Sequence, residues 1–152
     1  MNNNDILRRL RSAFSYTDAQ VTKIIAHVEG DLDPVQVGRW LKREDHGDYQ
    51  PVSDADLCRF LDGLIIEKRG ARPDGSIPEP LKVISRNEVL KKLRIALALR
   101  DEGMMDVFKH ADFVVTKAEL GSFFRKEGQR NYSECPEQVL RKFIHGLWQA
   151  AN

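Results

Sequence analysis

The 152-residue chain has few cysteines and no long apolar run. Its two cysteines, Cys58 and Cys135, lie far apart and in no metal-binding or redox spacing. This scarcity argues against a disulfide framework, and we expect two reduced thiols in a cytoplasmic protein. The N-terminal residues contain no apolar signal segment. No stretch approaches the roughly 20 apolar residues that would span a bilayer, so a membrane association is not expected.

Common catalytic motifs are also missing. The chain has no Gly-rich phosphate loop, no His-Glu-x-x-His and no Gly-x-Ser-x-Gly. We therefore expect no cofactor, no metal and no catalytic residue. The net charge is only +1, so the overall basic field of many dedicated nucleic-acid binders is absent. Hydrophobic residues make up 41% and charged residues 31%, a composition typical of a folded globular protein.

What the chain does contain is an internal repeat. Its first half aligns with its second half, without a gap, when it is shifted by 83 residues, and 14 of the 62 aligned pairs from Asn4/Asn87 to Ile65/Trp148 are identical. A repeat of this length is a whole supersecondary unit, and two copies are too few for an open solenoid. The sequence thus predicts an all-α fold, with two pseudo-symmetric four-helix repeats (residues 1–69 and 87–152) packed into one compact body.

Local signals support helices at matching places in the two repeats. Asn4 and Asn87 are the expected N-caps of the first helix of each repeat. Thr116 and Glu119 form a capping box. Residues 70–80 contain three prolines and an Asp-Gly turn, which predicts a linker over 70–86. Helical periodicity predicts ten buried side chains: Leu10, Ile25, Trp40, Phe60, Leu64, Leu93, Phe108, Phe123, Phe143 and Leu147.

Two pairs of equivalent glycines lie inside expected helices: Gly38 with Gly121, and Gly63 with Gly146. Glycine inside a helix costs about 1 kcal/mol relative to alanine. Its recurrence therefore indicates that something comes close to the backbone at these positions. The simplest interpretation is that the third and fourth helices of each unit cross there. The alternative is that a partner or a phosphate presses on the helix.

Three parts of the chain resemble the bacterial YehS family: residues 60–70, residues 87–96, and residues 124–127 together with 131–135. The resemblance covers nearly the whole chain. It implies a small, all-helical, duplicated cytoplasmic protein. It brings no catalytic residue, cofactor or substrate, because the family is one of unknown function.

Basic residues are the repeated feature that points outward. The candidate site for an anion or a nucleic acid consists of Arg8, Arg11, Lys91, Lys92 and Arg94. Acids such as Asp5 and Glu88 lie beside these residues. These acids could neutralise the basic residues, which would then form an ordinary solvated face.

Cys135 is the candidate reactive thiol, because a helix N-terminus lowers the pKa of a thiol. The alternative is a small buried side chain at the start of the helix. No polar constellation converges in the sequence, so we expect a non-enzymatic interaction module with a protein partner. Nucleic-acid binding through the basic helix faces is the alternative, and an enzyme with a non-obvious site is the second alternative.

Overall fold

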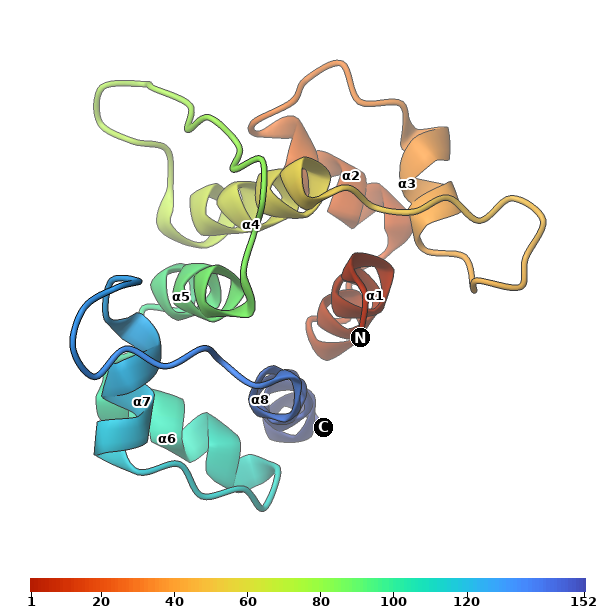
Figure 1. Cartoon of the computed structure of the whole chain (residues 1–152). Helices are drawn as coiled ribbons and strands as arrows, with labels where there is room; N and C mark the ends of the chain where they lie inside the picture. The colour runs from red at the N-terminus through yellow and green to blue at the C-terminus, as the bar shows by residue number, and fades with distance from the viewer.

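The computed structural model describes residues 1–152, and all of its regular elements are helices (Figure 1). The eight α-helices are α1 (Asn3–Ala13), α2 (Asp18–Ala26), α3 (Pro34–Trp40), α4 (Asp54–Arg69), α5 (Arg86–Ala96), α6 (Asp101–His110), α7 (Lys117–Phe124) and α8 (Glu137–Ala151). The expected all-α fold with four helices in each half is confirmed.

Each half of the chain packs its first helix against the fourth helix of the other half. The helix α1 lies against α8, and α5 lies against α4. In Figure 1 these four helices form the centre of the molecule, with α1 and α5 at opposite corners and α4 and α8 between them. Within each half, α2 packs on α4 and α6 packs on α8. The shift of 83 residues interchanges these contacts, so the two halves are related by an approximate two-fold symmetry.

One continuous core of 30 buried residues joins the two halves. Nine of the ten side chains predicted to be buried are buried, and Leu147 is half-buried. Equivalent residues contribute equally: Leu10 and Leu93 are fully buried, as are Phe60 and Phe143. Because apolar side chains of both halves share this core, we expect the halves to unfold together.

The glycines of the fourth helices mark the closest helix crossings. A methyl carbon added at Gly63 would lie 2.9 Å from the carbonyl carbon of Ile24 in α2. At Gly146 the same carbon would lie 2.9 Å from the carbonyl carbon of Val107 in α6. The predicted close approach is therefore confirmed, but the predicted partner is wrong, because the fourth helix crosses the second helix and not the third.

The glycines of the third helices have no such role. A methyl group added at Gly38 or at Gly121 would meet no atom within 4 Å. The prediction of a helix crossing at this pair is wrong. Both positions face open space, where no contact requires glycine.

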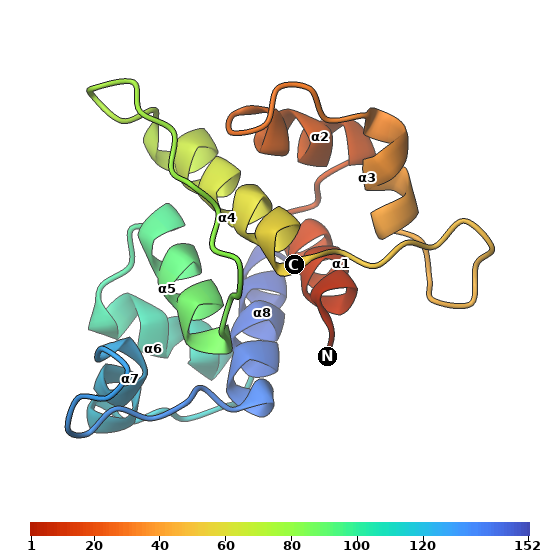
Figure 2. The same cartoon turned by 45° about the horizontal axis from the view of Figure 1, so that its top comes forward.

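The segment between Arg69 and Arg86 contains no helix and runs back along α4 (Figure 2). The Leu81 N–H donates to Cys58 Sγ at 3.3 Å, and the Ile84 N–H donates to Asp54 Oδ2 at 3.0 Å. These two bonds hold the end of the linker on α4 before the chain enters α5.

Six of the eight helices, all except α6 and α8, begin at a residue whose side chain caps them, although two of the predicted caps are wrong. Thr116 and Glu119 form the expected capping box. The first helix of each half, however, is capped by Asn2 and by Ser85, two residues before the predicted Asn4 and Asn87. Both of these asparagines lie inside the first turn and are buried.

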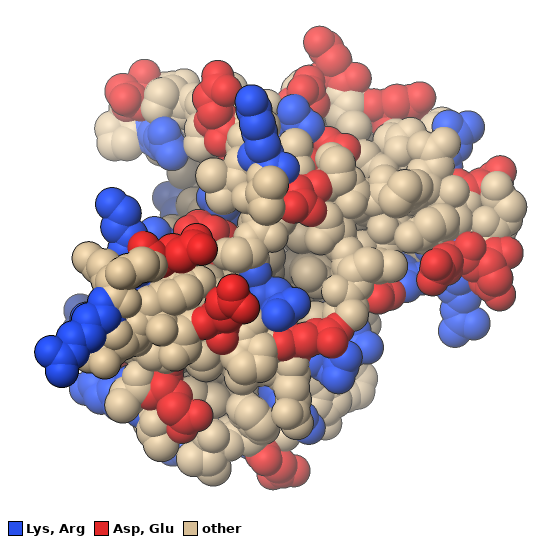
Figure 3. All heavy atoms as spheres, viewed as in Figure 1, with Lys and Arg blue, Asp and Glu red and all other residues tan.

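Charges of both signs lie on the face of the molecule that Figure 3 shows. On the face in Figure 3, Lys and Arg side chains are interspersed with Asp and Glu, and no large area has a single sign. No helix combines the length and the apolar character needed to cross a membrane.

Candidate functional site

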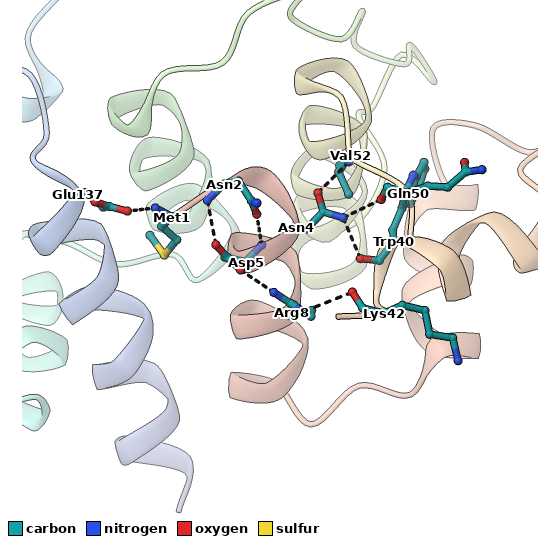
Figure 4. Close-up of polar contacts among 10 residues, drawn as sticks. All are labelled: Met1, Asn2, Asn4, Asp5, Arg8, Trp40, Lys42, Gln50, Val52 and Glu137. Atoms are coloured by element: carbon teal, nitrogen blue, oxygen red, sulfur yellow. Dashed lines mark hydrogen bonds and ion pairs between the residues drawn. The ribbon is translucent and has the colours of Figure 1, made fainter. Parts of the chain in front are cut away.

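The buried Asn4 ties α1 to the loop that follows α3 (Figure 4). Its Nδ2 donates to the carbonyl oxygens of Trp40 at 3.1 Å and Gln50 at 2.8 Å, and its Oδ1 accepts from the Val52 N–H at 2.9 Å. One side chain thus satisfies three backbone groups that no helix pairs. The loop 41–52 is held at both ends by this contact.

The same contact recurs in the second half. Asn87 Nδ2 donates to the carbonyl oxygens of Phe123 at 3.0 Å and Ser133 at 2.8 Å, and its Oδ1 accepts from the Cys135 N–H at 2.9 Å. Sequence reasoning missed this role. The available signal was an asparagine retained at equivalent positions on the apolar side of both first helices.

The two candidate arginines of α1 have internal partners. Arg8 pairs with Asp5 at 2.5 Å and donates to the Lys42 carbonyl at 3.3 Å (Figure 4). Partial burial of Asp5 opposes ionisation, but the Asn2 N–H and the Arg8 guanidinium outweigh it and lower the pKa of Asp5. Arg11 pairs with Asp18 at 3.2 Å. Each arginine therefore has a neighbouring carboxylate, and both are half-buried.

The three candidate residues of α5 differ from one another. Arg94 repeats the role of Arg11: it pairs with Asp101 at 2.8 Å and lies over the Phe124 ring at 4.7 Å. Lys92 pairs with Asp62 of α4 at 2.6 Å, with only 17% and 5% of the two side chains exposed. Lys91 is exposed and forms no ion pair. Because α1 and α5 lie at opposite corners, the five candidates fall into two separate clusters.

Cys135 lies just before α8, whose N-cap is Pro136. Its side chain is buried, and burial raises its pKa to about 11 despite the nearby Arg86 guanidinium. The thiol is therefore protonated at neutral pH, whereas a nucleophilic cysteine needs the thiolate. These features match the alternative role of Cys135, a small buried side chain at the start of the helix.

The first of two notable grooves, which we call the α1/α8 groove, consists of two adjoining hollows. A hollow of about 290 Å³ is lined by Arg9, Ser12, Ile144, His145 and Trp148. A second hollow, of about 450 Å³, is lined by Arg8, Arg11, Ser12, Ser15, Tyr16 and Trp148. The hollows share Ser12 and Trp148, so they form one continuous surface. Arg9, His145 and Trp148 were not predicted as site residues, because the alignment of the two repeats does not show that α1 packs on α8.

The second groove, which we call the α5/α7 groove, is a single hollow of about 690 Å³, larger than either hollow of the α1/α8 groove. Its walls are the linker, α5, α7 and the loop after α7, and its lining residues are Leu81, Val83, Ser85, Asn87, Glu88, Lys91, Phe123, Phe124, Arg125, Lys126, Glu127 and Tyr132. It brings the candidate Lys91 next to Arg125 and Lys126. Leu81 and Val83 have no counterpart in the first half, because residue 84 aligns with residue 1.

Neither groove is a metal site by composition, and no group of three or more His, Cys, Asp and Glu side chains in the chain is placed to hold a metal ion. Desolvation of its hydroxyl group, with the carboxylates of Glu127 and Glu134, raises the pKa of Tyr132, which lines the α5/α7 groove. The Tyr132 hydroxyl is therefore a neutral hydrogen-bonding group at physiological pH.

Comparison with known proteins places the chain in a family. The model of a family described as "Protein of unknown function (DUF1456)" matches residues 3–70 and again residues 86–151. The uncharacterized protein YehS of Escherichia coli (strain K12) is 35% identical over 147 residues, which cover 97% of this chain and 94% of that protein. No solved structure matches the chain. Two matches to one family model, each spanning four helices, agree with the duplication, and the chain belongs to the DUF1456 family.

Proposed function

We propose that the protein is a non-enzymatic, cytoplasmic interaction module that binds a segment of another protein in the α5/α7 groove. The observation that carries this proposal is the groove itself. It is a single hollow of about 690 Å³, and exposed apolar residues of the linker form one wall. Val83 is 78% exposed and Leu81 is 37% exposed, although valine and leucine are usually buried in folded proteins. Covering them would favour binding by removing apolar surface from water.

The aromatic side of the groove supports the same function. Phe123 and Phe124 come from α7, and Tyr132 comes from the loop after it. Aromatic residues dominate the energetics of protein interfaces because they bury a large area with few rotatable bonds. A short apolar segment, helical or extended, is the type of partner that such grooves accept.

The rim of the groove indicates the charge of the partner. The groove lining includes three basic residues (Lys91, Arg125 and Lys126) and two acidic ones (Glu88 and Glu127), and none of the five takes part in an ion pair within the chain. Unpaired rim charges select partners and speed association more than they add affinity. We infer that the bound segment carries apolar side chains flanked by at least one carboxylate.

A site-specific crosslinking experiment tests this function. A photoreactive amino acid is placed at Val83, and the matched control places it at Val114 in the α6–α7 loop, which is 79% exposed and lines neither groove. We expect discrete protein adducts from position 83 that survive nuclease treatment and decrease when Lys91→Glu and Lys126→Glu are added. The proteins found would then be purified, and their affinity for the intact chain measured by calorimetry.

Three results would refute the proposal: equal crosslinking from positions 83 and 114, adducts that disappear with nuclease, or purified adduct proteins that bind the Lys91→Glu/Lys126→Glu variant as tightly as the unchanged protein. Because these side chains are exposed, the substitutions should leave the melting temperature nearly unchanged. Loss of binding can therefore be assigned to the groove.

A further inference from the structure

Some equivalent positions in the two halves of the protein have side chains of different charge. The shift of 83 residues relates the contact of α5 with α4 to the contact of α1 with α8. In the first contact, Lys92 pairs with Asp62 at 2.6 Å. The aligned residues in the second contact are Arg9 and His145. Two basic side chains cannot form an ion pair with each other. The position that an ion pair occupies between α5 and α4 therefore has no ion pair at the equivalent place between α1 and α8.

The α1/α8 groove has the donors that an anion requires. Arg9 is exposed and forms no ion pair within the chain. No carboxylate lines either of its two hollows, whereas the α5/α7 groove contains two. The helices α1 and α8 together carry five Arg and Lys side chains and two acids, within a chain of net charge +1. Guanidinium groups bind phosphate oxygens through paired hydrogen bonds.

The groove also has an exposed aromatic surface. The Trp148 side chain is 39% exposed, and its ring stacks on His145 with centroids 5.9 Å apart and an angle of 15° between the planes. Such a surface accepts the flat face of a base, since stacking on aromatic side chains is the general way that proteins hold unpaired bases. The volume of about 290 Å³ in the Arg9 hollow is near the lower end of the roughly 300–1,000 Å³ typical of small-molecule sites.

We propose that the α1/α8 groove binds a nucleotide unit, with its base against Trp148 and its phosphate against Arg9 and Ser12. The nucleotide could be free or could belong to a single-stranded nucleic acid, because both present the same base and phosphate. An acidic peptide without aromatic residues would supply a negative charge but no planar ring for Trp148. The groove lies on different helices from the α5/α7 groove, so this proposal does not depend on the proposed function.

Intrinsic fluorescence gives a direct assay, because the chain has two tryptophans and Trp40 is only 3% exposed. A ligand that stacks in the groove should therefore quench Trp148 selectively. The intact protein is titrated with AMP, a ten-nucleotide RNA, inorganic phosphate and a polyglutamate peptide. We expect saturable quenching by AMP or by RNA, and at least tenfold weaker binding of inorganic phosphate and polyglutamate, which lack the ring.

Variants then test the two named contacts, with binding of a labelled nucleotide or RNA as the readout. Arg9→Glu should weaken binding by about tenfold or more, because a charge-assisted contact is replaced by repulsion. Arg130→Glu is the matched control, since Arg130 is exposed, forms no ion pair and lines neither groove. Trp148→Ala should weaken binding by about tenfold, and Trp148→Phe should retain most of it, as a stacking role requires. Thermal melts check that each variant is folded.

The same titrations separate the two sources of the nucleotide. If the source is a free nucleotide, AMP binds as tightly as the RNA. If it is a single strand, the RNA binds much more tightly, and the slope of log K against log salt is about −0.7 for each phosphate that an arginine contacts. Three results would overturn the proposal: no quenching by AMP or RNA at millimolar concentration, equal losses from Arg9→Glu and Arg130→Glu, or polyglutamate binding as tight and as dependent on Arg9 as nucleotide binding.

Discussion

Replacing Gly63 or Gly146 by alanine should destabilise the protein, although alanine is the better helix former. The added methyl group would overlap the backbone carbonyl of Ile24 or Val107. A backbone carbonyl cannot rotate away as a flexible side chain can, so α2 or α6 must move as a unit. Overpacking of this kind costs about 1–3 kcal/mol and sometimes more, and the gain in helix propensity offsets about 1 kcal/mol. We expect a net loss of up to about 2 kcal/mol in the free energy of unfolding.

The glycines of the third helices are the matched controls. Gly38 and Gly121 are also helical, but an added methyl group meets no atom within 4 Å. Alanine at either position should therefore raise the free energy of unfolding by about 0.5–1 kcal/mol. The measurement is urea unfolding followed by circular dichroism. The four single variants are compared on condition that they share the same m value, the slope of the free energy of unfolding against urea concentration.

The two groups of variants should move the unfolding midpoint in opposite directions. If Gly63→Ala and Gly146→Ala stabilised the protein as much as the controls do, the close crossings of α4 with α2 and of α8 with α6 would be wrong. The continuous core adds a second requirement: each variant should unfold in one transition. Two separate transitions would mean that the halves fold independently, contrary to the packing of α1 on α8 and α5 on α4.

Three other predictions test contacts that the structure assigns to single side chains. Asn4→Ala or Asn87→Ala removes three hydrogen bonds, two of them buried, and should lower the free energy of unfolding by roughly 2–4 kcal/mol in urea titrations. Between pH 9 and 11 the unfolded thiol of Cys135 ionises before the folded thiol, whose pKa is about 11. Stability should therefore fall as the pH rises, by up to about 1.4 kcal/mol per pH unit, and this fall should be smaller in Cys135→Ala. Asp62→Asn leaves the Lys92 ammonium without its carboxylate and should cost roughly 2 kcal/mol, whereas Asp62→Leu with Lys92→Met should recover most of this loss.

The helices themselves were predictable from sequence because local rules decide them. Apolar periodicity placed Leu10, Phe60, Leu93 and Phe143 in the core, and all four are fully buried. The capping box at Thr116 is equally local, since its partners are three residues apart. Asn4 failed as a predicted cap because asparagine favours two different roles near a helix start, and only the distant loop 41–52 decides between them.

Helix partners were less predictable, because the alignment of the two repeats shows only which residues are equivalent. It identified Gly63 with Gly146 as a close approach but could not show that the neighbour is Ile24 or Val107. The α1/α8 groove was hidden for the same reason. Arg9 and His145 are 136 positions apart and belong to different repeats, and only the packing of each first helix on the opposite fourth helix brings them into one hollow.

The duplication also shows where function can reside. Positions that keep the same residue and the same contact in both halves, such as Asn4 and Asn87, are explained by the fold alone. Binding sites are better sought where equivalent positions have diverged while the backbone contact is kept. The closed pair of Lys92 with Asp62 shows that this contact needs no ligand to be stable. The open hollow leaves the Arg9 guanidinium without an ion-pair partner and leaves 39% of Trp148 exposed beside His145, a departure that the proposed nucleotide binding would explain better than stability does.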